Sequence, residues 1–198
     1  VIIVYGGVSS LDFGSAARVY WTFKTIGHEN VSILNGGFKG WANGGNKVAT
    51  GENSITPANF KTKLNKKYFA SFSEVQKAQK GKGQQCLIDA RPAAFFVGDK
   101  KHAKARIPGR LANARNLQEG NLIDDSFKMK PSSAIKSQFG GLDGIEKYKG
   151  YISYCNTGHW AATVWFGLSE IAQIPNVKMY DGGMTHWTSN PKRKVDLG

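Results

Sequence analysis

The sequence predicts an α/β protein whose central, mostly parallel sheet is flanked by helices. Two observations lead to this fold class: short apolar segments alternate with amphipathic segments along the chain, and one such arrangement occurs twice. Parallel strands are joined by helical crossovers and are buried on both faces, which produces this alternation. At 198 residues the chain is long enough to bury a substantial core.

The internal repeat relates the start of the chain to its end. The segment AARVYW at residues 16–21 corresponds to AATVWF at residues 161–166. Each copy continues through an Asn-Val segment and a Gly-Gly pair to a tryptophan, Trp41 or Trp187, and the spacing agrees to within one residue. Each copy therefore predicts a strand, a loop, a helix, a second strand and a glycine turn, in that order.

The first copy is incomplete, because it holds only two predicted strands and the helix between them. Its opening segment VIIVY, residues 1–5, predicts a core strand. Residues 46–70 are rich in glycine, lysine and asparagine and indicate a linker. The chain thus divides into a first unit at residues 1–45, this linker, and a second unit at residues 71–198. A partial parallel sheet exposes an apolar edge, so we expect either a preceding segment that completes it or self-association.

The second unit is predicted to be a whole domain. A helix over residues 73–80 has Ser71 or Ser73 as its N-cap, and a strand over residues 86–90 follows. The remaining predicted elements are a short helix after Arg91 and Pro92, helices near 132–139 and 142–147, a strand at 151–154, a helix at 161–168, and a last strand before Gly182.

The net charge and its distribution along the chain indicate which kinds of partner the protein could bind. The net charge is +13 and the isoelectric point is near 9.8, but the basic residues are spread along the chain rather than gathered on one helix with interleaved aromatics. This distribution argues against a specific nucleic-acid site and favours a surface that attracts small anions. No segment approaches the roughly 18–20 apolar residues that cross a bilayer, so no membrane span is predicted.

Cys155 is the main candidate for chemistry. It follows the apolar segment 151–154 and opens the loop CNTGHW, residues 155–160, which leads into a predicted helix. N–H groups of such a loop and of a helix start point toward the sulfur and favour the thiolate. A buried, inert thiol is the alternative. Cys86 opens an apolar strand and is predicted to be an inert core thiol, so cysteine usage does not fix the cellular compartment.

Together these segments resemble a tandem rhodanese-type sulfurtransferase. The resemblance rests on LIDAR at 87–91, RIPG at 106–109, the Cys155 loop, and MYDGG at 179–183 with Trp187, and it covers nearly the whole chain. It implies a complete rhodanese-like domain preceded by part of a second, inactive one. In that inactive copy Gly6 takes the place of Cys155, and the loop before the Ala-Ala pair is about four residues longer.

The resemblance also implies a ping-pong reaction without a metal or cofactor. The Cys155 thiolate would take the outer sulfur of a small anionic donor, thiosulfate or 3-mercaptopyruvate. The resulting persulfide would pass that sulfur to cyanide or a thiol. The site residues implied are Asn156, Thr157, Gly158, His159 and Trp160 in the loop around the sulfur, Arg91 as a support with possible anion contact, and Asp89 and Asp181 as structural supports.

Several of these positions carry two interpretations. The Thr157 hydroxyl either relays a proton and orients the donor or stabilises the loop through a backbone hydrogen bond. His159 either acts as a cation that lowers the thiol pKa or is a partly exposed residue at a helix start. Trp160 either walls the pocket or packs. Phe95 stands where many relatives carry a second arginine that grips the donor, which weakens the case for thiosulfate.

Rival functions are a phosphatase, a non-catalytic interaction module, and a sulfur carrier for nucleotide thiolation. A phosphatase of the Cys-x5-Arg type needs an arginine six residues after the cysteine to clamp phosphate. That position is Ala161, which argues against this reaction. The half-missing first unit favours the interaction module, and the intact Cys155 loop opposes it. The sequence of the Cys155 loop and the basic composition favour a location in the bacterial periplasm slightly over one in the cytoplasm.

Overall fold

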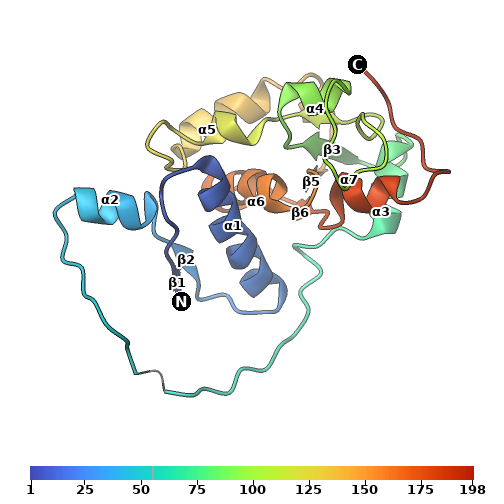
Figure 1. Cartoon of the computed structure of the whole chain (residues 1–198). Helices are drawn as coiled ribbons and strands as arrows, with labels where there is room; N and C mark the ends of the chain where they lie inside the picture. The colour runs from blue at the N-terminus through green and yellow to red at the C-terminus, as the bar shows by residue number, and fades with distance from the viewer. Residues whose placement is uncertain (55) are drawn as a thin grey trace.

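Four parallel strands form the main sheet in the structure, a computed structural model that describes residues 1–54 and 56–198 (Figure 1). The strand order is β4-β3-β5-β6. The strands are β3 (Gln85–Asp89), β4 (Arg115–Asn116), β5 (Gly150–Tyr154) and β6 (Val177–Met179). Phe69 adds a parallel bridge to Met179 at the outer edge of β6. The predicted α/β fold with a parallel sheet is confirmed.

The two central strands have the sequences expected of strands covered on both faces. Every residue of β5 is buried, and so is every residue of β3 except Gln85. The register pairs Asp89 with Tyr154. Because parallel strands end on the same edge of a sheet, this pairing places the residues that follow β3 and β5 next to each other.

Helices cover the sheet and follow the predicted order. The described elements are α3 (Phe72–Gln79), α4 (Ala93–Val97), η1 (Glu119–Leu122), α5 (Ser132–Gly140), η2 (Ile145–Lys147), α6 (His159–Phe166), the π-helical η3 (Gly167–Ile171) and α7 (Gly183–Thr188). Ser71 is the N-cap of α3 and forms a capping box with Glu74. The predicted helix over 142–147 is wrong, because Gly144 is left-handed and only the single 3₁₀ turn η2 follows it.

The first unit contains β1 (Ile2–Ile3), α1 (Ser10–Thr25), β2 (Ser32–Ile33) and α2 (Gly37–Asn43). The prediction of a core strand over residues 1–5 is wrong. Only two residues pair with β2, and Ile2 and Val4 are 71% and 54% exposed. Alternate residues of a strand face opposite sides, and α1 covers only the side of Ile3 and Tyr5. The expected self-association through this edge stays a prediction.

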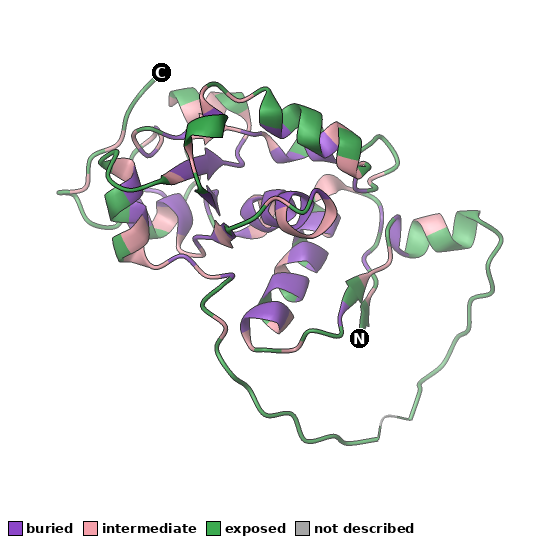
Figure 2. Cartoon of the chain, turned by 180° about the vertical axis from the view of Figure 1, so that it is seen from behind, coloured by how far each residue is buried: buried purple, intermediate pink, exposed green. Residues whose placement is uncertain are grey.

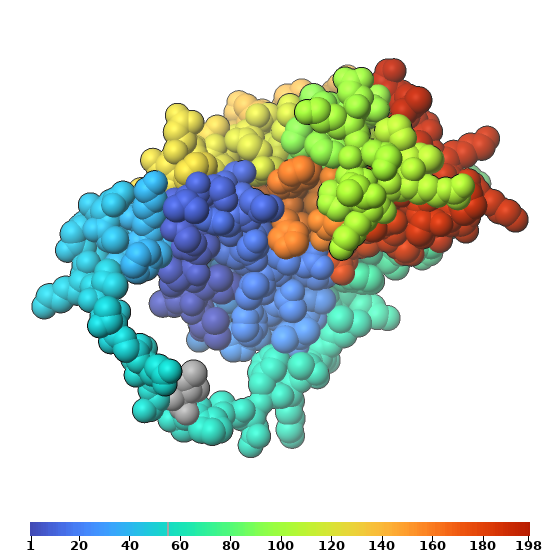
Figure 3. All heavy atoms as spheres, viewed as in Figure 1, coloured from blue at the N-terminus to red at the C-terminus, as the bar shows by residue number. Residues whose placement is uncertain are grey.

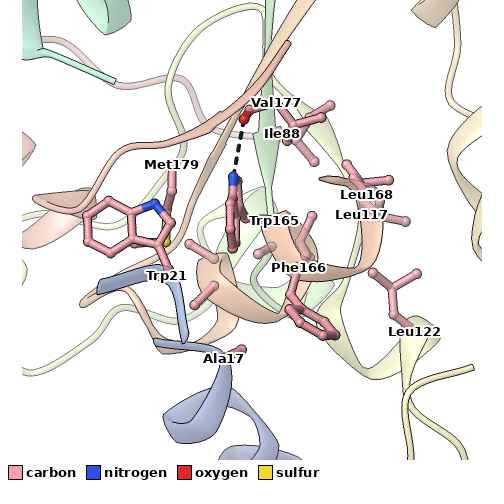
Figure 4. Packing of buried hydrophobic residues seen from close by; sticks show 14 of the residues in the cluster. Ala17, Trp21, Ile88, Leu117, Leu122, Trp165, Phe166, Leu168, Val177 and Met179 are labelled. Carbon is pink, nitrogen blue, oxygen red and sulfur yellow. Dashed lines mark hydrogen bonds between the residues drawn. The ribbon is translucent and has the colours of Figure 1, made fainter. Parts of the chain in front are cut away.

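The hydrophobic core runs from the first unit into the second (Figure 2). Helix α1 packs along α6, where the Phe13 and Tyr20 rings meet Phe166 edge-on. Trp165 lies at the centre, fully buried, and donates from its indole to the Val177 carbonyl at 3.1 Å (Figure 4). Trp21 of α1 donates in turn to the Tyr68 carbonyl at 3.0 Å. The two units are therefore held by one continuous core.

The segment between the units runs outside this core. Residues 46–54 and 56–64 have no regular secondary structure and are exposed (Figure 1). The segment returns to the first unit near its end, where the Phe60 ring meets His28 and the Lys63 N–H donates to the Ile26 carbonyl at 2.9 Å. The chain rejoins the sheet at Tyr68 and Ala70, which exchange backbone hydrogen bonds with Met179. In the part of the chain that the structure describes, no helix has the length and apolar character needed to cross a membrane.

Candidate active site

Cys155 follows β5 directly, and the loop that it opens supplies a backbone N–H donor to its sulfur. Its side chain is buried, and its Sγ accepts a hydrogen bond from the Gly158 N–H at 3.0 Å. The N–H groups of Thr157 and Ala161 also act on this sulfur. The Gly158 N–H thus points at the sulfur, and the role of the whole loop as a cradle for an anion stays a prediction.

Two glycines allow the loop to take this shape. Gly158 has φ of +101° at the start of α6, and Gly183 has φ of +54° in the turn after β6. A Cβ on Gly183 would lie 2.5 Å from the Asn156 carbonyl oxygen and 2.6 Å from that of Cys155. The Met184 N–H donates to the Cys155 carbonyl at 2.8 Å. The glycine turn thus holds the outer side of the cysteine loop by close backbone contact.

Burial raises the pKa of the Cys155 thiol above its ordinary value, although the N–H groups of Ala161, Gly158 and Thr157 lower it. The buried Asp89 charge adds to the increase. Desolvation of the anion therefore opposes the N–H donors in this site, and activation of the thiol by the loop stays a prediction.

Asp89 and Arg91 form a buried support under the loop. Arg91 is 2% exposed, and its guanidinium donates to both Asp89 carboxylate oxygens and to the Gly109 carbonyl. Its Nη1 reaches the Asn156 side-chain oxygen at 3.5 Å. Arg91 is committed to these partners and is not part of the pocket wall. The Asp89 pair keeps Arg91 beneath the loop as a support, and the anion contact expected of it stays a prediction.

A pocket of about 300 Å³ opens at Cys155. Its lining comes from three parts of the chain: Leu11 and Ser15 of α1, His102 after α4, and Cys155, Asn156, Thr157, His159 and Trp160. In Figure 3 the orange loop region is exposed between the blue surface of the first unit and the green surface of residues near 100. A larger hollow of about 790 Å³ lies where β5 and β6 begin and contains no residue of the Cys155 loop.

The two pocket histidines differ from the sequence expectation. Burial, and then the nearby Arg18 charge, lower the pKa of His159 below its ordinary value, so at neutral pH its neutral form is favoured. This direction argues against a cationic His159, and its role at the thiol stays a prediction. His102 also lines the pocket, and the sequence did not single it out. It sits on an irregular loop, so no local pattern could have revealed it.

Aromatic rings form one wall of the pocket. Trp160 lines the pocket, and the Phe95 ring meets it edge-on with 5.8 Å between centroids. Thr157 is exposed, and within the described residues its hydroxyl makes no hydrogen bond that would stabilise the loop. Arg106 is exposed and stands outside the pocket lining.

The internal repeat is shifted by one residue from the predicted correspondence. The Phe38 N–H donates to the Tyr5 carbonyl after one glycine pair, as the Met184 N–H donates to the Cys155 carbonyl after the other. Tyr5, not Gly6, therefore stands in the place of Cys155. The extra residues also lie in a helix rather than a loop, because α1 begins at Ser10, well before the Ala-Ala pair. The buried Tyr5 fills its position with a ring.

Asp181 follows β6 and reaches across to the first unit. Its carboxylate pairs with the guanidinium of Arg18 on α1. The Arg18 Nη1 also donates to the Thr157 carbonyl at 3.4 Å. Asp181 therefore supports the loop through α1. Within the described residues, no three His, Cys, Asp or Glu side chains gather in a way that could hold a metal ion.

A family model for the rhodanese-like domain matches residues 71–190, which is more than half of the chain. The chain belongs to the rhodanese-like family. The matched segment of this rhodanese-like chain runs from the N-cap of α3 to just beyond α7 and includes Cys155. The first unit, with α1 and its pocket residues, lies outside the matched segment.

Curated relatives of this rhodanese-like chain include enzymes and a carrier. The sulfur carrier protein TtuD of Thermus thermophilus is 26% identical over 87% of this chain and 63% of its own length. Thiosulfate sulfurtransferase of Gallus gallus is 30% identical over 98% and 66%, and 3-mercaptopyruvate sulfurtransferase of Escherichia coli is 30% identical over 92% and 64%. The chain spans about two thirds of the length of these relatives.

Solved structures agree with the rhodanese-like fold. An EanB variant in complex with ergothioneine aligns over 100% of this chain and 50% of its own, with a TM-score of 0.86 and 18% identity. A complex of EanB with hercynine aligns with a TM-score of 0.82 and 19% identity. The similarity covers both units of the chain, so the arrangement of the first unit on the second has a counterpart in experimental structures.

Proposed function

We propose that this protein is a sulfurtransferase that carries a sulfane sulfur as a persulfide on Cys155. The sulfur comes from a small anionic donor, thiosulfate or 3-mercaptopyruvate, and passes to cyanide or a thiol. The observation that carries this proposal is the Cys155 Sγ at the pocket, 3.0 Å from the Gly158 N–H and within the reach of two more donors. Relatives whose names include both donors support it.

The reaction has two balanced steps. The Cys155 thiolate attacks the outer sulfur of thiosulfate, the S–S bond of the donor breaks, and sulfite leaves with the bonding electron pair. Cyanide then attacks the outer sulfur of the persulfide, the Cys155 S–S bond breaks, and thiocyanate leaves as the thiolate is restored. No external oxidant or reductant is needed, because the sulfane sulfur moves from one nucleophile to the next.

The same backbone donors serve every anionic stage of this cycle. A thiolate, a persulfide and the departing sulfite each bear negative charge in the pocket, and fixed N–H groups stabilise such charge without reorganising. Burial opposes the free thiolate, and the backbone N–H donors offset part of that cost.

Intact-mass measurement tests the proposal directly. After incubation with either donor, the wild-type protein should gain about 32 Da, one sulfur atom, and lose it when cyanide is added. Cys155→Ser should show no gain and no thiocyanate. The matched control is Cys86→Ala, which removes the other buried thiol on β3 and should behave like the wild type. Persistence of the adduct in Cys155→Ser would refute the assignment.

The donor preference should depend on Phe95. Replacing it by arginine puts a cation beside Trp160, where an anionic donor enters, so we expect KM for thiosulfate to fall about tenfold through a charge-assisted contact. Phe95→Leu is the control, because it loses the ring contact and adds no charge. Steady-state kinetics with both donors measure the effect. Equal changes in the two variants would contradict the role given to charge at this position.

A sulfur carrier is the second candidate function, favoured by the relative TtuD, whose name states that role. A carrier also forms a Cys155 persulfide but hands it to another protein rather than to cyanide. The mass experiment separates the two: a stable adduct of about 32 Da with little thiocyanate favours the carrier. A non-catalytic interaction module would give neither the adduct nor thiocyanate.

A further inference from the structure

We propose that Arg18 of α1 is a positioning residue for the Cys155 site, acting through the peptide that joins Thr157 to Gly158. The inference rests on the proposed function only in taking Cys155 as the reacting group. Arg18 lies in the first unit, outside the segment that the family model matches. The first unit would then take part in the chemistry as well as in the core.

The geometry places Arg18 and Cys155 at opposite ends of one peptide group. The Arg18 Nη1 donates to the Thr157 carbonyl at 3.4 Å, and the N–H of the next residue, Gly158, donates to the Cys155 Sγ at 3.0 Å. In a trans peptide the C=O and N–H point in opposite directions. A guanidinium at the oxygen therefore favours the orientation in which the N–H faces the sulfur.

The electrostatics act in the same direction. Hydrogen bonds in a chain polarise one another, and a charged donor strengthens the effect. A cation bound to the Thr157 oxygen makes the Gly158 N–H a stronger donor to an anionic sulfur. The Thr157 residue is exposed, so water would take the place of a missing guanidinium, but without its charge or its fixed direction. The anion on Cys155 is therefore better stabilised with Arg18 present.

Three contacts hold Arg18 in this position. Its guanidinium pairs with the Asp181 carboxylate, and its Cζ lies 5.4 Å from the centre of the Trp21 ring. The third contact is with Gly158, where a Cβ would lie 1.6 Å from the Arg18 Nη1. Glycine at this position thus serves the left-handed backbone and also the close approach of the arginine. The side chain is 26% exposed, which leaves it only partly screened by solvent.

Other charged and titratable groups also face the thiol. They are Asp89 and Arg91 beneath the loop, His159 on α6, His102 in the pocket, and Asp181 beside Arg18. Asp89 is balanced by Arg91, and Asp181 balances part of the Arg18 charge. The effect of Arg18 therefore depends on its oriented hydrogen bond as well as its charge. A lysine, which keeps the charge but loses the planar fork, should retain only part of it.

The test is the pH dependence of Cys155 alkylation by iodoacetamide, followed by intact mass in the Cys86→Ala background. In Arg18→Met the alkylation profile should move to higher pH by about one unit, so the rate at a fixed pH below the midpoint falls about tenfold. Arg18→Lys should show a smaller shift. Arg106→Gln, which removes an exposed charge outside the pocket, should match the reference protein.

An unchanged profile in Arg18→Met, or an equal shift in Arg106→Gln, overturns the inference. Thermal unfolding checks that α1 stays docked, and Arg18→Gln replaces the methionine variant if that variant does not fold. The readout needs no sulfur donor. If wild type forms no persulfide, the proposed function fails while the alkylation profile still decides the role of Arg18.

Discussion

Arg91→Met should lower the free energy of unfolding by about 3–5 kcal/mol, because it leaves the Asp89 carboxylate buried without its partner. Asp89 is fully buried, and Arg91 supplies three of its hydrogen bonds from the side chain. The change also removes the N–H that reaches the Asn156 side chain. We therefore expect sulfur transfer to fall as well, since Asn156 is the first loop residue after the nucleophile. Urea unfolding measures the loss of stability.

A surface pair provides the matched control for this prediction. Asp143 lies 3.6 Å from Arg115 and its side chain is 97% exposed, so Asp143→Asn, which leaves the Arg115 hydrogen bond to the Asp143 carbonyl in place, should change stability very little. The double variant Asp89→Leu with Arg91→Met should recover part of the loss, because no charge is then left unpaired in the interior. A loss below about 1 kcal/mol in Arg91→Met alone would contradict the supporting role of the pair.

Trp165→Ala should cost about 3–5 kcal/mol of unfolding free energy through the cavity that it leaves. The ring is fully buried, packs edge-on against Tyr68 and near Tyr20 of α1, and satisfies the Val177 carbonyl (Figure 4). Its loss therefore loosens the first unit and the sheet together. Because the two units share this core, denaturant unfolding should remain a single transition.

Trp41→Ala is the control for this second prediction. Trp41 is 42% exposed at the end of the first unit, and its indole donates only to the Lys47 carbonyl. It should change stability far less than Trp165→Ala does. Two separate transitions in the wild type, or similar effects of the two tryptophan variants, would show that the units do not unfold as one.

Local sequence patterns were enough to predict the elements around the site. The capping serine, the strand before Asp89 and the glycine of the Cys155 loop each carry a short-range signal, and the structure places them where that signal indicated. The family resemblance then joined these elements in the right order. The parallel sheet, which was predicted, brings the ends of β3 and β5 together.

The features that the sequence did not predict depend on long-range packing. Leu11, Ser15 and Arg18 reach the site only because α1 lies along α6, and no local pattern specifies that contact. The raised pKa of Cys155 depends on how deeply the loop is buried. Backbone hydrogen bonds show which residues of the two repeat copies correspond, and they place Tyr5 opposite Cys155. The spacing of the two copies differs by one residue, so the sequence alone pointed to Gly6 instead.

The exposed segment between the units acts as a tether rather than as part of the folded body. It has no regular structure over residues 46–54 and 56–64, while the units on either side share a core. A single cut there would leave a noncovalent complex of two fragments, each holding part of the pocket. The fraction of molecules with a complete pocket would then depend on the protein concentration. In the uncut chain, the tether gives the first unit a high effective concentration at the site.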